Sequence, residues 1–250
     1  MKRFLRNQLT CWMPEDFEID GNTYFKNPTS RQAINNIQRK AILNYLVEPN
    51  YGSTGVCMHV RNIEQVKMLD PFSTAIPRAD GICMDREFMK KNRIGIFMRP
   101  SDCIALCINT DKDVRILHIS VESLNNGILM NLPTSFQHAE AVLGPCICKG
   151  HLLYDLADNR VGNKRALAMQ PSSYEKFIER TKYYKVFGYE QFITVDEEHN
   201  KASIDIKGIV RHELRKAKID IVFDDTRCTV CDSLGSHRLL NNKANAMVIF

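Results

Sequence analysis

Three residues of the sequence, His59, Cys103 and His118, are of types that bind borderline metal ions such as zinc. Each stands at one end of a stretch with strand character: His59 and His118 close such stretches and Cys103 precedes one. Ligands at strand ends can converge on one ion and leave a coordination position open, which is typical of catalytic zinc. Spacing alone does not bring the three together, and a lone histidine beside apolar residues is more often a packing residue.

Two short cysteine motifs are further metal candidates. Cys228 and Cys231 form a CxxC motif, and Cys146 and Cys148 form a CxC motif whose thiols would share one face of a strand. A zinc finger needs a second pair at a set spacing, so each motif alone is at most half of a zinc site. The nine cysteines are odd in number and follow no export signal, which argues against a disulfide framework.

The composition is that of a globular protein. The 250 residues are 44% hydrophobic and 25% charged, with a formal net charge of +5. The basic run Lys90-Lys91-Asn92-Arg93 reads as a solvated turn, so we expect no nucleic-acid partner. No apolar stretch reaches the length of a membrane span or a signal peptide. We therefore expect a cytoplasmic monomer with no membrane partner.

Hydrophobic periodicity predicts the elements that must position these residues. It indicates a helix over 31–47, ended by Pro49 and Gly52, and a second over 123–137 that Pro133 interrupts. A helical region is expected near 172–184, and Asp205 opens an amphipathic helix with basic residues in its last turns. The predicted strands cover 56–60, 81–84, 94–98, 104–108, 114–119, 141–143, 219–223 and 246–250.

The order of these elements predicts an α/β fold of mixed α+β layers. Strands and helices alternate, but the connections between them are uneven, which favours layers over a regular doubly wound sheet. No repeat or Gly/Ser/Pro-rich linker divides the chain. We therefore expect a single domain over 1–250.

Seven motifs, in order from about residue 56 to 250, resemble the laccase-domain family (YfiH-like, once called multicopper polyphenol oxidoreductases). The resemblance implies the fold of that family, with a divergent N-terminal part over 1–55. The segments that carry it are Ala79-Asp80-Gly81, Ser101-Asp102-Cys103, the segment from His118 to Ser123, Gly144-Pro145-Cys146-Ile147 with Tyr154-Asp155, Asp205-Ile206, Cys228-Thr229 and Ser236-His237-Arg238.

The resemblance implies a zinc cofactor and a purine nucleoside substrate. Family members bind zinc through histidines of Q-V-H-G and H-A-G-W-R-G segments and the cysteine of A-D-C, and these positions fall on His59, His118 and Cys103. His59 lacks the flanking Gln and Gly but is the only histidine before Cys103. The implied reactions are phosphorolysis of adenosine or inosine and deamination of adenosine, with phosphate or water as co-substrate. Other members are described as polyphenol oxidases or as peptidoglycan-precursor editing factors.

Four residues receive catalytic roles in this reading. Cys103 is a metal ligand, and Asp102 either moves a proton or supports the ligand loop. Arg99 and Arg238 would attract a phosphate, unless they are ordinary surface arginines. Blue-copper chemistry is disfavoured, because the seven histidines include no HxH pair.

One segment departs sharply from the family pattern. Where the family has Gly-Trp-Arg-Gly, this chain has Ser120-Val121-Glu122-Ser123, which replaces a cation with an anion, and His237 replaces a family tyrosine. Two alternatives therefore stay open. The chain is a divergent member recruited to another reaction on a small metabolite, or it is a non-catalytic metal-binding or interaction protein.

Overall fold

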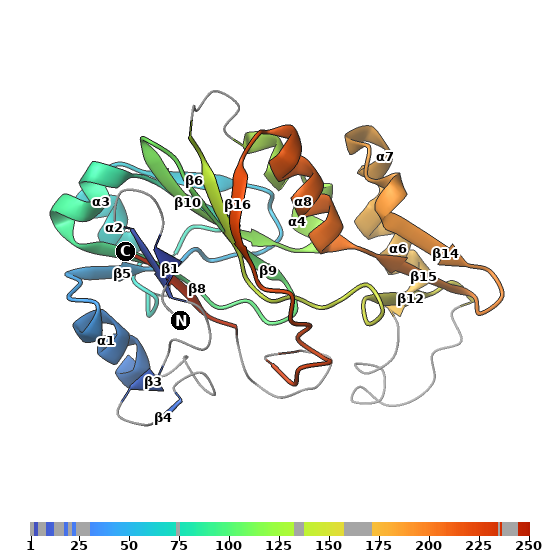
Figure 1. The fold of residues 1–250 in the computed structure, drawn as a ribbon, viewed down its shortest axis with the longest axis horizontal. Helices are drawn as coiled ribbons and strands as arrows, with labels where there is room; N and C mark the ends of the chain where they lie inside the picture. Colours follow the sequence, from blue (N-terminus) through green and yellow to red (C-terminus); the bar gives the residue numbers. More distant parts are fainter. Residues whose placement is uncertain are drawn as a thin grey trace.

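The computed structural model describes residues 3–4, 9–12, 18–19, 22–23, 31–73, 76–132, 138–157, 172–234, 236 and 245–250. These residues form layers of helices and sheets (Figure 1). The mixed α/β fold class predicted from the sequence is confirmed. The expectation of a single domain stays a prediction.

A six-stranded mixed sheet forms the centre of the molecule. All six residues of β9 are buried, because alternate side chains face two different hydrophobic clusters. β9 and β10 pair antiparallel. On the other side of β10, β7 also pairs antiparallel with it, and β6 pairs parallel with β7. In order across the sheet, the strands are β16 (Asp220–Asp224), β11 (Glu140–Leu143), β9 (Ile104–Asn109), β10 (Asp113–Ile119), β7 (Gly81–Asp85) and β6 (Cys57–Val60).

A five-stranded sheet packs against one face of the central sheet. One hydrophobic cluster joins the two sheets, with Ile96 and Met247 from the outer sheet and Cys107 and Ile116 from the central sheet. The strand order in the outer sheet is β1 (Arg3–Phe4), β2 (Thr10–Trp12), β17 (Met247–Ile249), β8 (Ile94–Met98) and β5 (Tyr45–Val47).

Helices cover the outer faces of the two sheets. Ile34 and Ile37 of α1 (Arg31–Lys40) pack with Phe97 on the far side of the five-stranded sheet. On the opposite side, α4 (Val121–Asn125), the 3₁₀ turn η4 (Ile128–Asn131) and α8 (Ile206–Lys216) cover the central sheet (Figure 1). Of two short helices, α2 (Ile63–Met68) contacts β5, and α3 (Arg86–Asn92) contacts β7 and β8.

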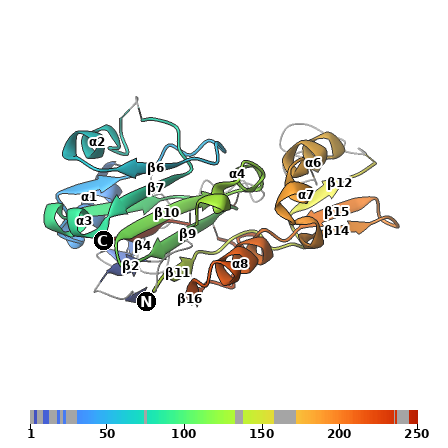
Figure 2. The ribbon, with the colours of Figure 1, turned by 90° about the horizontal axis from the view of Figure 1, so that it is seen from above.

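A smaller four-stranded sheet lies at one end of the molecule, away from α1, α2 and α3 (Figure 2). The aromatic rings of Tyr154, Phe177 and Tyr184 join it to the main core. Its strands are β13 (Ser172–Ser173), β12 (Leu153–Asp155), β15 (Lys201–Ile204) and β14 (Ile193–Asp196), with α6 (Tyr174–Thr181), α7 (Tyr184–Phe187) and the 3₁₀ turn η5 (Glu190–Phe192) beside it. A two-stranded pair, β3 (Glu18–Ile19) and β4 (Asn22–Thr23), completes the described elements.

The predicted strands are confirmed within a residue or two at their ends, and the helices are partly corrected. α1 ends at Lys40, because Ile42 adopts a left-handed backbone with φ of 56° and the chain then enters β5. The helix expected over 123–137 is the five-residue α4 followed by η4, divided at Gly127 with φ of 74°, and residues 133–137 lie outside the described residues. The basic run predicted as a turn instead ends α3.

Across the part of the chain that the structure describes, no helix combines the length and the apolar character needed to cross a membrane.

Candidate functional site

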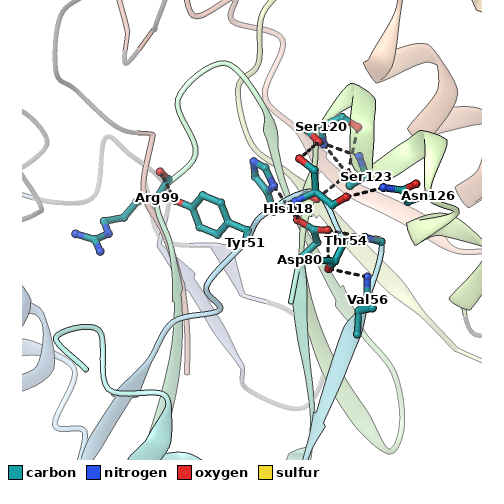
Figure 3. Close-up of polar contacts among 11 residues, drawn as sticks. Tyr51, Thr54, Val56, Asp80, Arg99, His118, Ser120, Ser123 and Asn126 are labelled. Atoms are coloured by element: carbon teal, nitrogen blue, oxygen red, sulfur yellow. Dashed lines mark hydrogen bonds and ion pairs between the residues drawn. The ribbon is translucent and has the colours of Figure 1, made fainter. Parts of the chain in front are cut away.

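His118, near the end of β10, lies in a buried polar site between the loop over residues 51–55 and the start of α4 (Figure 3). Its ring stacks on that of Tyr51, with centroids 4.3 Å apart and an interplanar angle of 25°. On its other side, Nδ1 lies 3.5 Å from Oδ1 of Asp80. The Ser123 hydroxyl donates to the His118 carbonyl oxygen at 3.0 Å, so the backbone of this residue is also fixed.

The carboxylate of Asp80 holds the loop over residues 51–55 in place. The backbone N–H groups of Ser53 and Gly55 donate to it at 2.9 and 2.6 Å, and the Thr54 hydroxyl donates at 3.2 Å. Burial alone would raise the pKa of Asp80, but the contacts with His118, Gly55 and Ser53 outweigh it and lower that pKa. Asp80 is therefore ionised at neutral pH and forms a fixed anion behind the imidazole ring.

Cys103 lies at the start of β9, close enough to Tyr51 for their ionisations to interact. Burial raises the pKa of its thiol, and the carboxylates of Glu122 and Asp102 raise it further. Glu122, at the position of the family arginine, forms an ion pair of 2.5 Å with Arg180 of α6. The charge reversal noted in the sequence is thus compensated by a cation from a distant part of the chain.

In the structure, His59 and His118 lie on different faces of the central sheet. His59 pairs in register with Cys83 of β7, and Cys83 pairs with Arg115 of β10. Residues paired across neighbouring strands share one face of a sheet, and alternate residues along a strand change face. His118 is three residues after Arg115, so the two histidines point to opposite faces.

The face that carries His59 forms a separate, open pocket of about 410 Å³, lined also by Cys83, Asp85 and Asp113. Among the described residues, His59, Cys103 and His118 are not a group whose ligand atoms lie together. The metal role assigned to this trio stays a prediction, and no chemical step proposed below passes through a metal held by it.

The other predicted site residues have structural partners. Arg99 donates two hydrogen bonds to the carboxylate of Glu48, at 2.9 and 2.5 Å. Asp102 accepts a hydrogen bond of 2.8 Å from the Thr229 hydroxyl, in accord with the loop-supporting alternative. Arg238 lies outside the described residues.

A second cluster of metal-binding side chains lies where the segment after β11 meets the segment after β16. Cys148, His151, Cys228 and Cys231 place one sulfur or nitrogen atom each within 4.8 Å of the others. The chain therefore has a Cys/His cluster able to hold a metal ion. All nine cysteines are free thiols.

Backbone N–H groups stabilise the thiolate form of Cys228 in this cluster. The N–H groups of Cys148 and Cys231 point at the sulfur of Cys228 at 3.2 and 3.5 Å. Burial raises the pKa of Cys228, but these N–H groups, with that of Val230 and the thiol of Cys148, lower it overall to about 7.

The sequence showed two halves of this cluster without showing that they meet. A parallel bridge between Cys146 and Cys228, beside the parallel pairing of β11 with β16, brings them together. Of the CxC pair, Cys148 joins the cluster, and Cys146 is buried in the main hydrophobic core. The missed signal is His151, three residues after Cys148, which makes a C-x-x-H pair to match the C-x-x-C pair.

The layered α/β fold is that of the laccase-domain class. The chain belongs to the family described as multi-copper polyphenol oxidoreductase laccase, whose model matches residues 31–248. No match was found among curated proteins.

Solved structures show the same fold. A Neisseria meningitidis protein, NMB0706, superposes with a TM-score of 0.65 at 16% identity, over 99% of this chain and 95% of its own. The hypothetical protein YfiH of Bacillus licheniformis gives 0.61 at 18% identity, over 87% and 79% of the two chains. YlmD of Geobacillus stearothermophilus gives 0.61 at 15% identity, over 97% and 90%. At these identities the likeness shows the fold alone.

Proposed function

We propose that the chain is an enzyme that acts on a purine nucleoside or a related small metabolite, with His118 as its acid–base residue. The observation that carries this proposal is the buried His118, with Nδ1 turned to the ionised carboxylate of Asp80. The substrate class rests on the family resemblance.

The pair has the arrangement of a histidine oriented by a carboxylate. A carboxylate beside Nδ1 fixes the tautomer with its proton on that atom and stabilises the imidazolium that forms during proton transfer. Nε2 of His118 is then the atom that takes up or gives a proton. The Nδ1–Oδ1 distance of 3.5 Å is longer than a hydrogen bond, and such contacts tighten when substrate binds.

Charge compensation favours hydrolytic deamination over phosphorolysis. An incoming phosphate needs cations, and within the described part of the chain Arg99 is paired with Glu48 and Arg180 with Glu122. Deamination needs only water. In this reaction a water oxygen bonds to C6 of adenine, His118 takes a proton from that water, the bond from C6 to the amino nitrogen breaks, and the proton passes to the departing ammonia.

A second candidate is a non-catalytic binding protein. It is favoured by Tyr51, whose ring covers one face of His118 while its hydroxyl donates to the Arg99 carbonyl oxygen at 2.8 Å. A residue held in this way would occupy space that a substrate needs.

Chromatography that monitors the turnover of adenosine, and of inosine with phosphate, distinguishes the enzyme from the non-catalytic binding protein. We expect the wild type to convert adenosine to inosine and His118→Ala to lose about 100-fold or more in kcat/KM, the usual scale of acid–base catalysis. Asp80→Asn should lose activity by a smaller factor.

The matched control is His59→Ala, a histidine on the opposite face of the same sheet, which should keep wild-type turnover. Wild-type turnover no higher than that of His118→Ala would contradict the enzyme and leave the binding protein. Loss of activity in His59→Ala as large as in His118→Ala would instead support the predicted metal role of His59 beside Cys103 and His118.

A further inference from the structure

We propose that Cys148, His151, Cys228 and Cys231 bind one zinc ion that braces the loop carrying Cys103. This site is distinct from the His118 site and does not depend on the proposed enzyme activity. Three sulfur atoms and one nitrogen are a ligand set typical of structural zinc.

The distances match the edges of a zinc tetrahedron. With zinc–sulfur bonds of about 2.3 Å and zinc–nitrogen bonds of about 2.0–2.1 Å, a sulfur and a nitrogen of one tetrahedron lie about 3.6 Å apart. The sulfurs of Cys148, Cys231 and Cys228 lie 3.2, 3.6 and 3.8 Å from Nδ1 of His151. The cluster therefore needs little rearrangement to close around an ion.

Two tight turns hold the ligands. The N–H groups of His151 and Leu152 donate to the Cys148 carbonyl oxygen at 3.0 Å. In the other segment, the N–H of Asp232 donates to the Cys228 carbonyl oxygen at 3.0 Å, and the Asp232 carboxylate accepts the Cys228 N–H at 2.7 Å. The first turn presents the C-x-x-H pair and the second presents the C-x-x-C pair, so each turn supplies two metal-binding side chains three residues apart.

The cluster lies at the margin of the main hydrophobic core, which includes Ile147 and Leu152 and packs against Val230. Cys231 is exposed, Cys148 and His151 are half-buried, and Cys228 alone is buried. A metal ion bound by segments about eighty residues apart would add a further link between them.

Hydrogen bonds connect the cluster to the loop before β9, which contains Asp102 and Cys103. The Thr229 hydroxyl donates to Asp102 at 2.8 Å, and the N–H of Ile147 donates to the Asp102 carbonyl oxygen at 2.9 Å. Thr229 follows one ligand directly, and Ile147 precedes another. Zinc in the cluster would thus fix Asp102 and, through it, the position of Cys103.

Metal analysis of the full chain, purified under reducing conditions, tests this site. We expect one zinc per chain by mass spectrometry, and a cobalt-substituted form with the visible bands of tetrahedral thiolate coordination. His151→Ala and Cys231→Ser should lower the zinc affinity by more than the about 10–100-fold that loss of an outer-shell partner costs. His151→Cys supplies a new thiolate and should restore binding.

Three control variants separate this site from the His118 site: Cys57→Ser, Cys103→Ala and His118→Ala should each keep one zinc. Hydrogen exchange gives a second readout, because amides at 101–104 should exchange faster once a chelator removes the ion. The proposal is overturned if the wild type takes up no zinc, if His151→Ala keeps it at full affinity, or if a disulfide joins Cys228 to Cys231 in the reduced preparation.

Discussion

At the residue scale, the site is built from backbone positions as much as from functional side chains. Gly55 donates its N–H to Asp80 at 2.6 Å and has φ of 71°, a left-handed conformation that side chains disfavour. A Cβ atom added there would meet the Asn126 carbonyl oxygen and lie 2.7 Å from the Asn126 Cβ atom. The carboxylate behind His118 is therefore held by a position that only glycine fits.

We predict that Gly55→Ala destabilises the fold by about 2–4 kcal/mol, because left-handed strain and overpacking add together. Gly188→Ala is the matched control. Its φ is 75°, but a Cβ atom there meets nothing within 4 Å, so it should cost only the about 1–2 kcal/mol of backbone strain. Urea unfolding of both variants measures the difference, and equal costs would contradict the crowding at Asn126.

At the element scale, the sequence predicted most of what positions the site. The strands that follow Asp80 and Cys103, and the strand that contains His118, are apolar runs between turn residues, so their existence follows from local pattern. The ends of α1 and α4 do not, because left-handed residues at Ile42 and Gly127 end these helices within an amphipathic pattern. Register is also not local, and register places His59 and His118 on opposite faces of the central sheet.

The start of α8 is a feature that the local sequence predicts correctly. Asp205 was expected to open this helix, and its carboxylate accepts the N–H of Gly208 at 2.8 Å as an N-cap. We predict that Asp205→Ala lowers the free energy of unfolding by about 0.5–2 kcal/mol, and that Asp205→Ser, which keeps a capping oxygen, recovers most of the loss. Thermal unfolding measures both variants, and equal melting temperatures for Ala and Ser would contradict the cap.

At the scale of the whole molecule, the chain keeps the fold of its family, and its Cys/His cluster and its polar site are formed by different residues. Glu122 with Arg180 fills the place of the family arginine, and Tyr51 covers His118. The Cys/His cluster depends on β11 lying beside β16, a contact between segments about eighty residues apart. Sequence pattern finds each half of such a cluster, but only the assembled sheet joins them.

Anomalous scattering at the zinc absorption edge, measured on crystals of the full chain grown with zinc, tests the metal site proposed for this cluster most directly. The account predicts a strong peak between Cys148, His151, Cys228 and Cys231, whether or not zinc also binds beside His118. A peak beside Cys103 and His118 with the cluster empty would contradict it.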